Sequence, residues 1–284
     1  MGFLNSVKEI VFLGPGGSYS EMAKDFFCKN FNLNVMETPF KTITQVIEYV
    51  DKNEDILGVI PVENSIEGAV REAIDCLIKT KNTDLQYIAE YVMPIRHCLL
   101  SKCNDINSVS GLISHPQAIA QCLGFIHNRL PKNIDIVKAT STAKAAVLLD
   151  EYALTYSAIG SAKTAELYNL NILEKNINDD PTNQTRFILI GKYKTHCTGN
   201  DKTSLAFSTE NKPGMLLEAL KVFQNYNINL CYIDSRPSKI VFGEYTFLVD
   251  FDGHVSDEII SKAIEELKTK TSYFRIVGSY EKLS

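Results

Sequence analysis

Residues Asn183 to Phe187, with the sequence Asn-Gln-Thr-Arg-Phe, bring together side chains that could bind a ligand or take part in a reaction. They place a hydroxyl, a guanidinium and two amides directly before the apolar run 187–191, whose short, branched pattern is typical of a buried strand. A dense cluster of turn-forming residues, 176–182, precedes them. Loops of this kind tend to carry function, although the same pattern also suits a solvated loop that leads into an edge strand.

Serine and threonine clusters mark five other points at which a predicted strand is followed by a predicted helix. The carboxyl ends of strands in an α/β sheet are where ligands bind, so five such junctions indicate a polar cleft rich in helix N-termini. We expect a small anionic ligand that is held mainly by neutral donors. Each junction alone can equally be a simple N-cap, and His115 faces either the cleft or a local backbone carbonyl. The five junctions lie near Ser18, Ser65, Ser114, Ser141 and Ser161.

The order of these elements predicts a two-lobed α/β unit over residues 7–194. We expect one lobe to contain about 7–90 plus 166–194 and the other to contain 91–165. The extended run from Leu85 to Leu100, interrupted by Pro94, is expected to cross between the lobes. The strand after Thr185 is expected to return to the first lobe.

The tail has its own pattern and is predicted to be a separate domain. A polar linker is expected at 195–202, and residues 203–284 follow the order β, α, β, β, α, β, which is typical of a ferredoxin-like sandwich. The strands are expected at 203–209, 228–233, 241–251 and 274–280, with helices that begin at Pro213 and Ser256.

Composition narrows the class of protein. The chain has 284 residues, is 45% hydrophobic and carries a net charge of -5 without a long basic block, which argues against a nucleic-acid partner. It has no apolar stretch of the length of a membrane span and no leader pattern, so we expect a cytoplasmic protein. Its seven cysteines never form a CxxC pair and its five histidines show no ligand spacing, so we expect no metal.

Taken together, six segments of the chain resemble the prephenate dehydratase family over almost its whole length. The tail is similar to the ACT regulatory domain of these enzymes through KPGMLLEAL and DSRP. No chorismate mutase region precedes the matching part, so we expect a monofunctional protein. The six segments are LGPGGSYSE, GVIPVENSIEGAV, SHPQAIAQC, STAKAA, IGSAKTAELYNLNIL and NQTRFILIG.

The resemblance implies an activity, a fold and a form of regulation. The activity is decarboxylative dehydration of prephenate to phenylpyruvate in L-phenylalanine biosynthesis, without a cofactor. The fold is a catalytic domain like a two-lobed periplasmic binding protein, with the substrate between the lobes. Feedback inhibition by L-phenylalanine at an interface between paired ACT domains requires a homodimer or homotetramer.

The resemblance also implies a set of site residues. The catalytic residue is Thr185, and the substrate-binding residues are Arg186, Phe187, Glu63, Asn64, Ser65, Ser114 and Gln121. The effector-binding residues are Gly214, Met215, Leu216, Leu217, Asn229, Asp234, Ser235, Arg236 and Pro237.

Chemistry assigns roles within this set. We expect Thr185 to assist departure of the ring hydroxyl, because charge develops there in the transition state. A cation bound to the ring carboxylate would stabilise a charge that the group must lose when it leaves as carbon dioxide, and it would therefore slow the reaction. Arg186 therefore either binds the pyruvyl carboxylate or forms a structural ion pair. Two other functions remain open: arogenate dehydratase, and a non-catalytic amino-acid sensor with the same fold.

Overall fold

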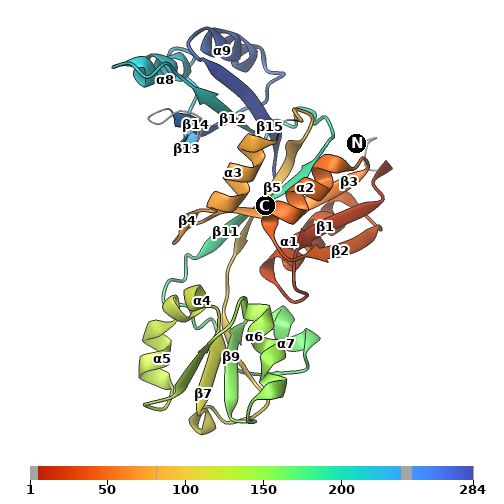
Figure 1. Ribbon diagram of the computed structural model, residues 1–284, viewed down its shortest axis with the longest axis vertical. Helices are drawn as coiled ribbons and strands as arrows, with labels where there is room; N and C mark the ends of the chain where they lie inside the picture. Colours follow the sequence, from red (N-terminus) through yellow and green to blue (C-terminus); the bar gives the residue numbers. More distant parts are fainter. Residues whose placement is uncertain (1–5, 81, 238–244, 284) are drawn as a thin grey trace.

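Three regions are stacked along the long axis of the molecule (Figure 1). One lobe lies at the bottom, a second lies in the middle, and a domain with helices α8 and α9 lies at the top. The computed structural model describes residues 6–80, 82–237 and 245–283.

The middle region, which we call the first lobe (6–94 and 184–191), is a mixed sheet covered by helices. β1 lies between β2 and β3 and is parallel to both, whereas β11 runs antiparallel to β3 and β5. The hydroxyl of Ser18 caps α1 by accepting a hydrogen bond from the backbone N–H of Glu21, as its sequence predicts. The elements are β1 (Glu9–Leu13), α1 (Tyr19–Phe31), β2 (Met36–Phe40), α2 (Ile43–Lys52), β3 (Ile56–Asn64), β4 (Gly68–Ala69), α3 (Arg71–Lys79), β5 (Gln86–Pro94) and β11 (Gln184–Gly191).

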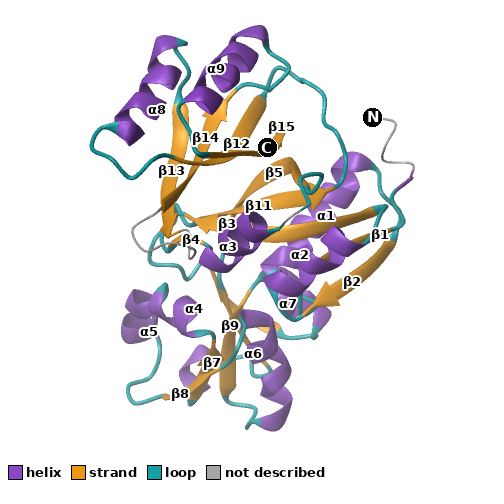
Figure 2. Cartoon of the chain, turned by 45° about the horizontal axis from the view of Figure 1, so that its top comes forward, coloured by secondary structure: helices purple, strands orange, loops and turns teal. Residues whose placement is uncertain are grey.

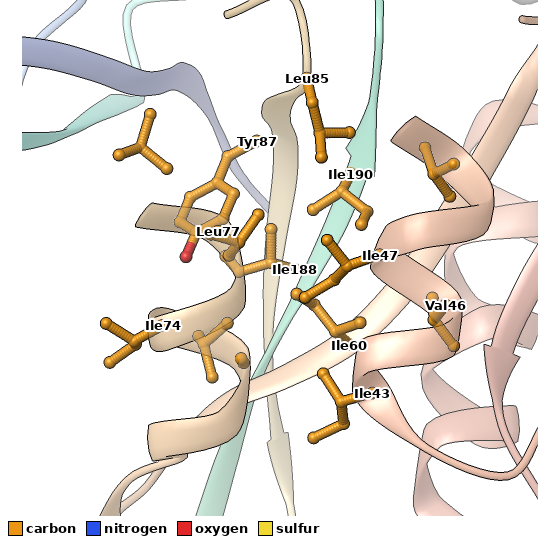
Figure 3. Packing of buried hydrophobic residues seen from close by; sticks show 14 of the residues in the cluster. Ile43, Val46, Ile47, Ile60, Ile74, Leu77, Leu85, Tyr87, Ile188 and Ile190 are labelled. Atoms are coloured by element: carbon orange, nitrogen blue, oxygen red, sulfur yellow. The ribbon is translucent and has the colours of Figure 1, made fainter. Parts of the chain in front are cut away.

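Helices α2 and α3 pack their apolar faces on this sheet (Figure 3). The isoleucines, leucines and valines on these faces recur at three- and four-residue spacing, so each helix presents one continuous apolar stripe. This packing supports β3 and β11, the strands that end in Asn64 and begin near Thr185. The buried residues of the contact include Ile43, Ile47, Ile60, Ile74, Leu77, Tyr87, Ile188 and Ile190.

One of the five predicted strand-to-helix junctions is wrong. After Asn64 the chain turns back as β4, which pairs with the end of β3, and helix α3 begins only at Arg71. The Asn64 side-chain oxygen accepts hydrogen bonds from the backbone N–H groups of Ile66 and Glu67, which stabilises this turn instead of a helix start.

The lower region, the second lobe (95–183), is a five-stranded sheet in the order β10-β6-β9-β7-β8. Its helices begin where the serine clusters predicted: Ser141 caps α6 and Ser161 caps α7. The elements are β6 (Cys98–Ser101), η2 (Ile106–Ser108), β7 (Gly111–Ser114), α4 (Pro116–Ala120), α5 (Leu123–Arg129), β8 (Asp135–Lys138), α6 (Thr142–Leu148), η3 (Leu149–Glu151), β9 (Tyr156–Gly160), α7 (Ala162–Leu167) and β10 (Asn171–Lys175).

The predicted return to the first lobe at residue 166 is too early. β10 pairs antiparallel with β6, and its residues Ile172 and Leu173 pack on the apolar clusters of the second lobe. The chain re-enters the first lobe with β11, which pairs with β3 and β5. The two crossings between the lobes are therefore the segment after Pro94 and the segment before Gln184.

The upper region, the C-terminal domain (201–283), has the predicted order of strands and helices. Helices α8 and α9 cover one face of its antiparallel sheet around Phe223 and Leu267. Residues 241–244 of the predicted strand 241–251 lie outside the described part of the chain. The elements are β12 (Asp201–Ser208), α8 (Met215–Asn225), β13 (Leu230–Pro237), β14 (Tyr245–Asp252), α9 (Glu258–Thr269) and β15 (Tyr273–Leu283).

The C-terminal domain and the first lobe share one continuous sheet, whose strands are drawn in orange in Figure 2. β15 pairs in parallel with β5, which gives the strand order β13-β14-β12-β15-β5-β11-β3-β1-β2. Tyr280 and Leu248 of the domain belong to the same buried cluster as Ile188 of the first lobe. None of the helices in the described part of the chain is long and apolar enough to span a membrane.

Candidate active site

A cavity of about 330 Å³ lies between the two lobes. The first lobe contributes the start of α1, the end of β3 and the start of β11, while the second lobe contributes the starts of α4 and α6. The polar residues that line it are Ser18, Tyr19, Ser20, Asn64, His97, His115, Gln117, Gln121, Thr140, Ser141, Thr142 and Thr185.

The cavity is lined by apolar residues, by hydroxyl and amide groups and by two histidines. Among the described residues that line it there is no lysine, arginine, aspartate or glutamate. This agrees with the expectation of a site built from neutral donors. Elsewhere in the described residues, no group of three or more histidine, cysteine, aspartate or glutamate side chains is placed to hold a metal ion.

Thr185 lies in this cavity with its hydroxyl oriented by Asn64. The Asn64 Nδ2 atom lies 2.9 Å from Thr185 Oγ1, and the Asn64 Oδ1 atom is occupied by the two backbone N–H groups of the β3–β4 turn. Asn64 is therefore the donor and Thr185 Oγ1 the acceptor. The two hydrogens of Asn64 Nδ2 are shared among Thr185 Oγ1, Asn183 Oδ1 and the Gln184 carbonyl, each 2.9 Å away. In the described structure Thr185 Oγ1 donates to no protein acceptor, which leaves its hydrogen available to a ligand in the cavity.

Gln121 and His97 approach the cavity from the second lobe and from the crossing after β5. Gln121 Oε1 lies 2.9 Å from Asn183 Nδ2 and 3.2 Å from His97 Nε2. Burial lowers the pKa of His97 to about 4, an effect that the Gln121 hydrogen bond only partly offsets. His97 is therefore a neutral imidazole throughout the neutral pH range.

Arg186 is not in the cavity, so its expected contact with a substrate carboxylate is wrong. Successive residues of a strand point to opposite faces of the sheet, and Arg186 points away from Thr185 toward the C-terminal domain. Its guanidinium nitrogens lie 2.7 Å from Glu90 Oε2, 2.6 Å from Asp250 Oδ2 and 2.5 Å from the Tyr280 hydroxyl. The structural ion pair, the other alternative, is the arrangement observed.

Glu63 is also placed away from the cavity, for the same reason. It pairs in register with Arg186 on the neighbouring strand, and the two side chains approach to 3.7 Å on the far face. Phe187, two residues after Thr185, returns to the cavity side and lines it. The alternation therefore divides each of the two sequence motifs between both faces of the sheet.

The two predicted serine contacts have structural roles instead. The Ser114 hydroxyl is fully buried and donates to the backbone carbonyl of Ile159 on the neighbouring strand. Ser65 is exposed, and its hydroxyl accepts a hydrogen bond from the backbone N–H of Gln184. Neither serine is among the cavity residues, so both substrate-binding expectations are corrected.

Several cavity residues were absent from the predicted substrate set. His97 and Tyr19 meet there, with His97 Nδ1 lying 3.0 Å from the Tyr19 hydroxyl. His115 lines the cavity while its Nδ1 accepts a hydrogen bond from the backbone N–H of Gln117. His97 follows the proline that ends β5, a place where the sequence shows a crossing but nothing that distinguishes a cleft residue.

The predicted effector residues fall into two groups in the C-terminal domain. Gly214, Leu216 and Leu217 line a second cavity of about 410 Å³ at the start of α8, where Gly214 has a φ of 84°. Met215 is the first residue of α8. The second group lies on β13, at the end of the ten-stranded sheet, or just before it: Asn229, Asp234, Ser235, Arg236 and Pro237.

Both parts of the chain are similar to known protein families. Residues 10–195, which hold both lobes and the cavity, match the family model for prephenate dehydratase, and residues 203–269 match the model for the ACT domain. The chain belongs to the prephenate dehydratase family. It is accordingly an enzyme of the dehydratase type, a carbon–oxygen lyase, with a C-terminal ACT domain.

Individual proteins of known name or structure support this membership. A prephenate dehydratase from Methanocaldococcus jannaschii is 40% identical over 278 residues, which cover 96% of this chain and 98% of the relative. The solved structure of a prephenate dehydratase from Arthrobacter aurescens in complex with L-Phe has a TM-score of 0.85 at 31% identity, over 96% of this chain and 89% of that one. A structure described as GqqA, a novel type of quorum quenching acylase, has a TM-score of 0.83 at 28% identity, over 97% and 98% of the two chains.

Proposed function

We propose that this chain converts prephenate to phenylpyruvate in the cytoplasm, as a step of L-phenylalanine biosynthesis. The observation that carries the proposal is the Thr185 hydroxyl, which lies in the inter-lobe cavity and accepts a hydrogen bond from Asn64, with its own hydrogen directed to no protein acceptor among the described residues. Such a hydroxyl can donate to the oxygen that leaves the substrate ring.

The reaction requires bonds to break at two opposite ring positions. The ring carbon–oxygen bond breaks, the ring carboxylate leaves as carbon dioxide, and the electron pair of its carbon–carbon bond completes the aromatic ring. The departing hydroxide takes up a proton and leaves as water. Hydrogen bonding from Thr185 stabilises the negative charge that develops on that oxygen, so this hydrogen bond is stronger in the transition state than in the ground state.

The neutral lining suits the second half of this reaction. A guanidinium or ammonium against the ring carboxylate would stabilise the ground state more than the transition state, because the carboxylate loses its charge as carbon dioxide. The position of Arg186 on the far face removes that contact. Gln121, whose Nε2 atom has no protein partner, is left to hold a substrate oxygen through an amide donor, while Asn64 acts by orienting Thr185.

The same lining predicts a preference for prephenate over arogenate. Arogenate carries an ammonium where prephenate has a keto group, and the described cavity residues offer it no carboxylate partner. An unpaired ammonium in the cavity is expected to cost about 1–3 kcal/mol, so kcat/KM for arogenate should be lower by about 5- to 150-fold. Assays of both substrates with the same preparation measure this ratio.

A variant provides the matched control for this prediction. Gln117→Glu adds a carboxylate to the cavity at the start of α4, and it should shift the ratio of kcat/KM values toward arogenate. Equal values for the two substrates in the unmodified chain would refute the preference. Failure to consume either substrate would refute the proposed activity itself.

Amide hydrolysis, the activity in the name of the acylase structure, finds less support. A serine or threonine nucleophile ordinarily hydrogen-bonds to a histidine that acts as its base. Among the described residues that line the cavity, no serine or threonine hydroxyl makes such a bond, since His97 contacts Gln121 and Tyr19 and His115 contacts Gln117. The geometry therefore favours the dehydration.

For regulation, L-phenylalanine is the effector, bound where two ACT domains of a homodimer or homotetramer meet. The cavity at Gly214 has an apolar part, formed by Leu216, Leu217, Leu220 and Phe247, that can hold the phenyl ring. β13 ends the sheet without a neighbour on one side among the described strands. A second copy of the chain can bring its own Asp234 and Arg236 to this pocket. Binding must then favour an arrangement with lower affinity for the transition state.

Leu217→Glu should separate regulation from catalysis. A carboxylate in the apolar pocket is expected to raise the L-phenylalanine concentration for half-inhibition by about tenfold or more, with kcat unchanged. Ile259→Glu on α9, an exposed apolar position of similar accessibility outside this pocket, is the control and should be inhibited normally. Full inhibition of Leu217→Glu, or of a chain that sediments strictly as a monomer, would contradict this part of the proposal.

A further inference from the structure

The amides around Thr185 form a chain of hydrogen bonds with one direction. It starts at the β3–β4 turn, where two backbone N–H groups can only donate and therefore fix Asn64 Oδ1 as an acceptor. Asn64 Nδ2 must then donate, and it lies 2.9 Å from Asn183 Oδ1. The Asn183 amide is thereby oriented as well, with its Nδ2 on the other side.

This direction continues into the second lobe. Asn183 Nδ2 donates to Gln121 Oε1 at 2.9 Å, so the Gln121 oxygen faces Asn183 and also faces His97 Nε2 at 3.2 Å. An oxygen can only accept, so His97 must carry its proton on Nε2. His97 Nδ1 is then a bare acceptor for the Tyr19 hydroxyl, whose hydrogen serves either this nitrogen or the Arg96 carbonyl at 2.8 Å.

At the end of this series of hydrogen bonds, the Gln121 Nε2 donor remains unused. Gln121 is 8% exposed and lines the inter-lobe cavity, and its Nε2 atom is buried without a protein partner. A buried amide nitrogen without an acceptor costs free energy, so such a group is expected to meet a ligand atom. Both acceptor positions of Gln121 Oε1 are taken, so the amide cannot turn over without losing two hydrogen bonds.

We propose that His97 and Asn183 are positioning residues for the dehydration: together they hold Gln121 Oε1 so that Gln121 Nε2 is presented to an oxygen atom of the substrate. This inference rests on the proposed function, because it assigns the ligand of Gln121 as an oxygen of that substrate. His97 acts here as a neutral donor, not as an acid or a base. Its burial and its low pKa suit that role.

Substitution of His97 tests whether it acts through Gln121. His97→Leu removes the donor and is expected to lower kcat/KM by about 10- to 100-fold, mainly through KM, because the Gln121 contact holds substrate in ground and transition states alike. His97→Gln can place an amide N–H where Nε2–H was, and it should recover most of this loss. A merely structural role would not produce recovery that is confined to the variant with a donor.

A double-mutant cycle adds the decisive control. In a Gln121→Met background, His97→Leu should lower kcat/KM by no more than about twofold, because the group it positions is already absent. Equal losses in the two backgrounds, or a His97→Gln variant as slow as His97→Leu, would overturn the proposal. Far-UV circular dichroism and L-phenylalanine binding check that each variant is folded.

The tautomer of His97 can also be measured by NMR on the unmodified chain, without any variant. The ¹⁵N chemical shifts of a neutral imidazole distinguish its two tautomers, and the expected result for His97 is a protonated Nε2 and a bare Nδ1 at neutral pH. The opposite tautomer, or an imidazolium, would overturn the proposal. This readout contains no substrate, so it stays separate from failure of the prephenate assay, which would refute the proposed function.

Discussion

Replacement of Thr185 with valine is expected to lower kcat for prephenate by about 10²–10³, with little change in KM. Valine has the shape of threonine and suits the strand, so the fold is retained while the hydroxyl is lost. Asn64 keeps its contacts with Asn183 Oδ1 and the Gln184 carbonyl, both at 2.9 Å, so its amide stays in place. Steady-state kinetics with purified protein measure the effect.

The control for this substitution is Thr185→Ser. Serine retains a hydroxyl that can accept from Asn64 and donate to the leaving oxygen, so its kcat should remain within about tenfold of the unmodified value. A valine variant with undiminished kcat would remove Thr185 from the mechanism. A valine variant with unchanged kcat and a raised KM would make it a binding residue only.

Arg186→Leu is expected to destabilise the protein by about 3–5 kcal/mol, because the substitution leaves the buried Asp250 carboxylate without a cation and removes one of the two cations beside Glu90. Glu90 and Asp250 are 3% and 1% exposed, and Lys202 compensates only Glu90. Urea unfolding measures the loss. For the fraction that remains folded, KM for prephenate should change by no more than about threefold, since Arg186 does not line the cavity.

An exposed ion pair supplies the comparison. Lys221→Ala breaks the pair with Glu218 on α8, where both side chains are nearly half exposed, and it should leave the urea midpoint nearly unchanged because solvent screens the pair. If Arg186→Leu were as stable as Lys221→Ala and raised KM by two orders of magnitude, Arg186 would be a substrate ligand after all. The ion pairs of Arg186 would then contribute little to the stability of the protein.

These expectations show where sequence patterns suffice and where they do not. Hydrophobic periodicity and serine caps predicted the α/β lobes and the βαββαβ order, because helix and strand formation depends on local spacing. Thr185 and Asn64 were placed in the cleft correctly. Arg186 and Glu63 were not, because whole motifs were assigned to the site although neighbouring strand residues face opposite sides of a sheet.

Other features depend on contacts that no local pattern encodes. The segment 171–175 is short and alternates weakly, so only its pairing with β6 assigns it to the second lobe. His97 acquires its role from Gln121 and Tyr19, which lie 24 and 78 positions away in the chain. The pairing of β15 with β5 joins the ACT domain to the first lobe in one sheet, and it brings Asp250 to Arg186.

The role of the Thr185 hydroxyl is to act on the bond that breaks and not on substrate affinity. Single-turnover mixing of excess enzyme with prephenate measures this role, because the rate of phenylpyruvate formation then reports the chemical step without product release. We expect a fall of about 10²–10³ in that rate for Thr185→Val and a near-normal rate for Thr185→Ser. An unchanged single-turnover rate in Thr185→Val would show that the hydroxyl does not act on that bond.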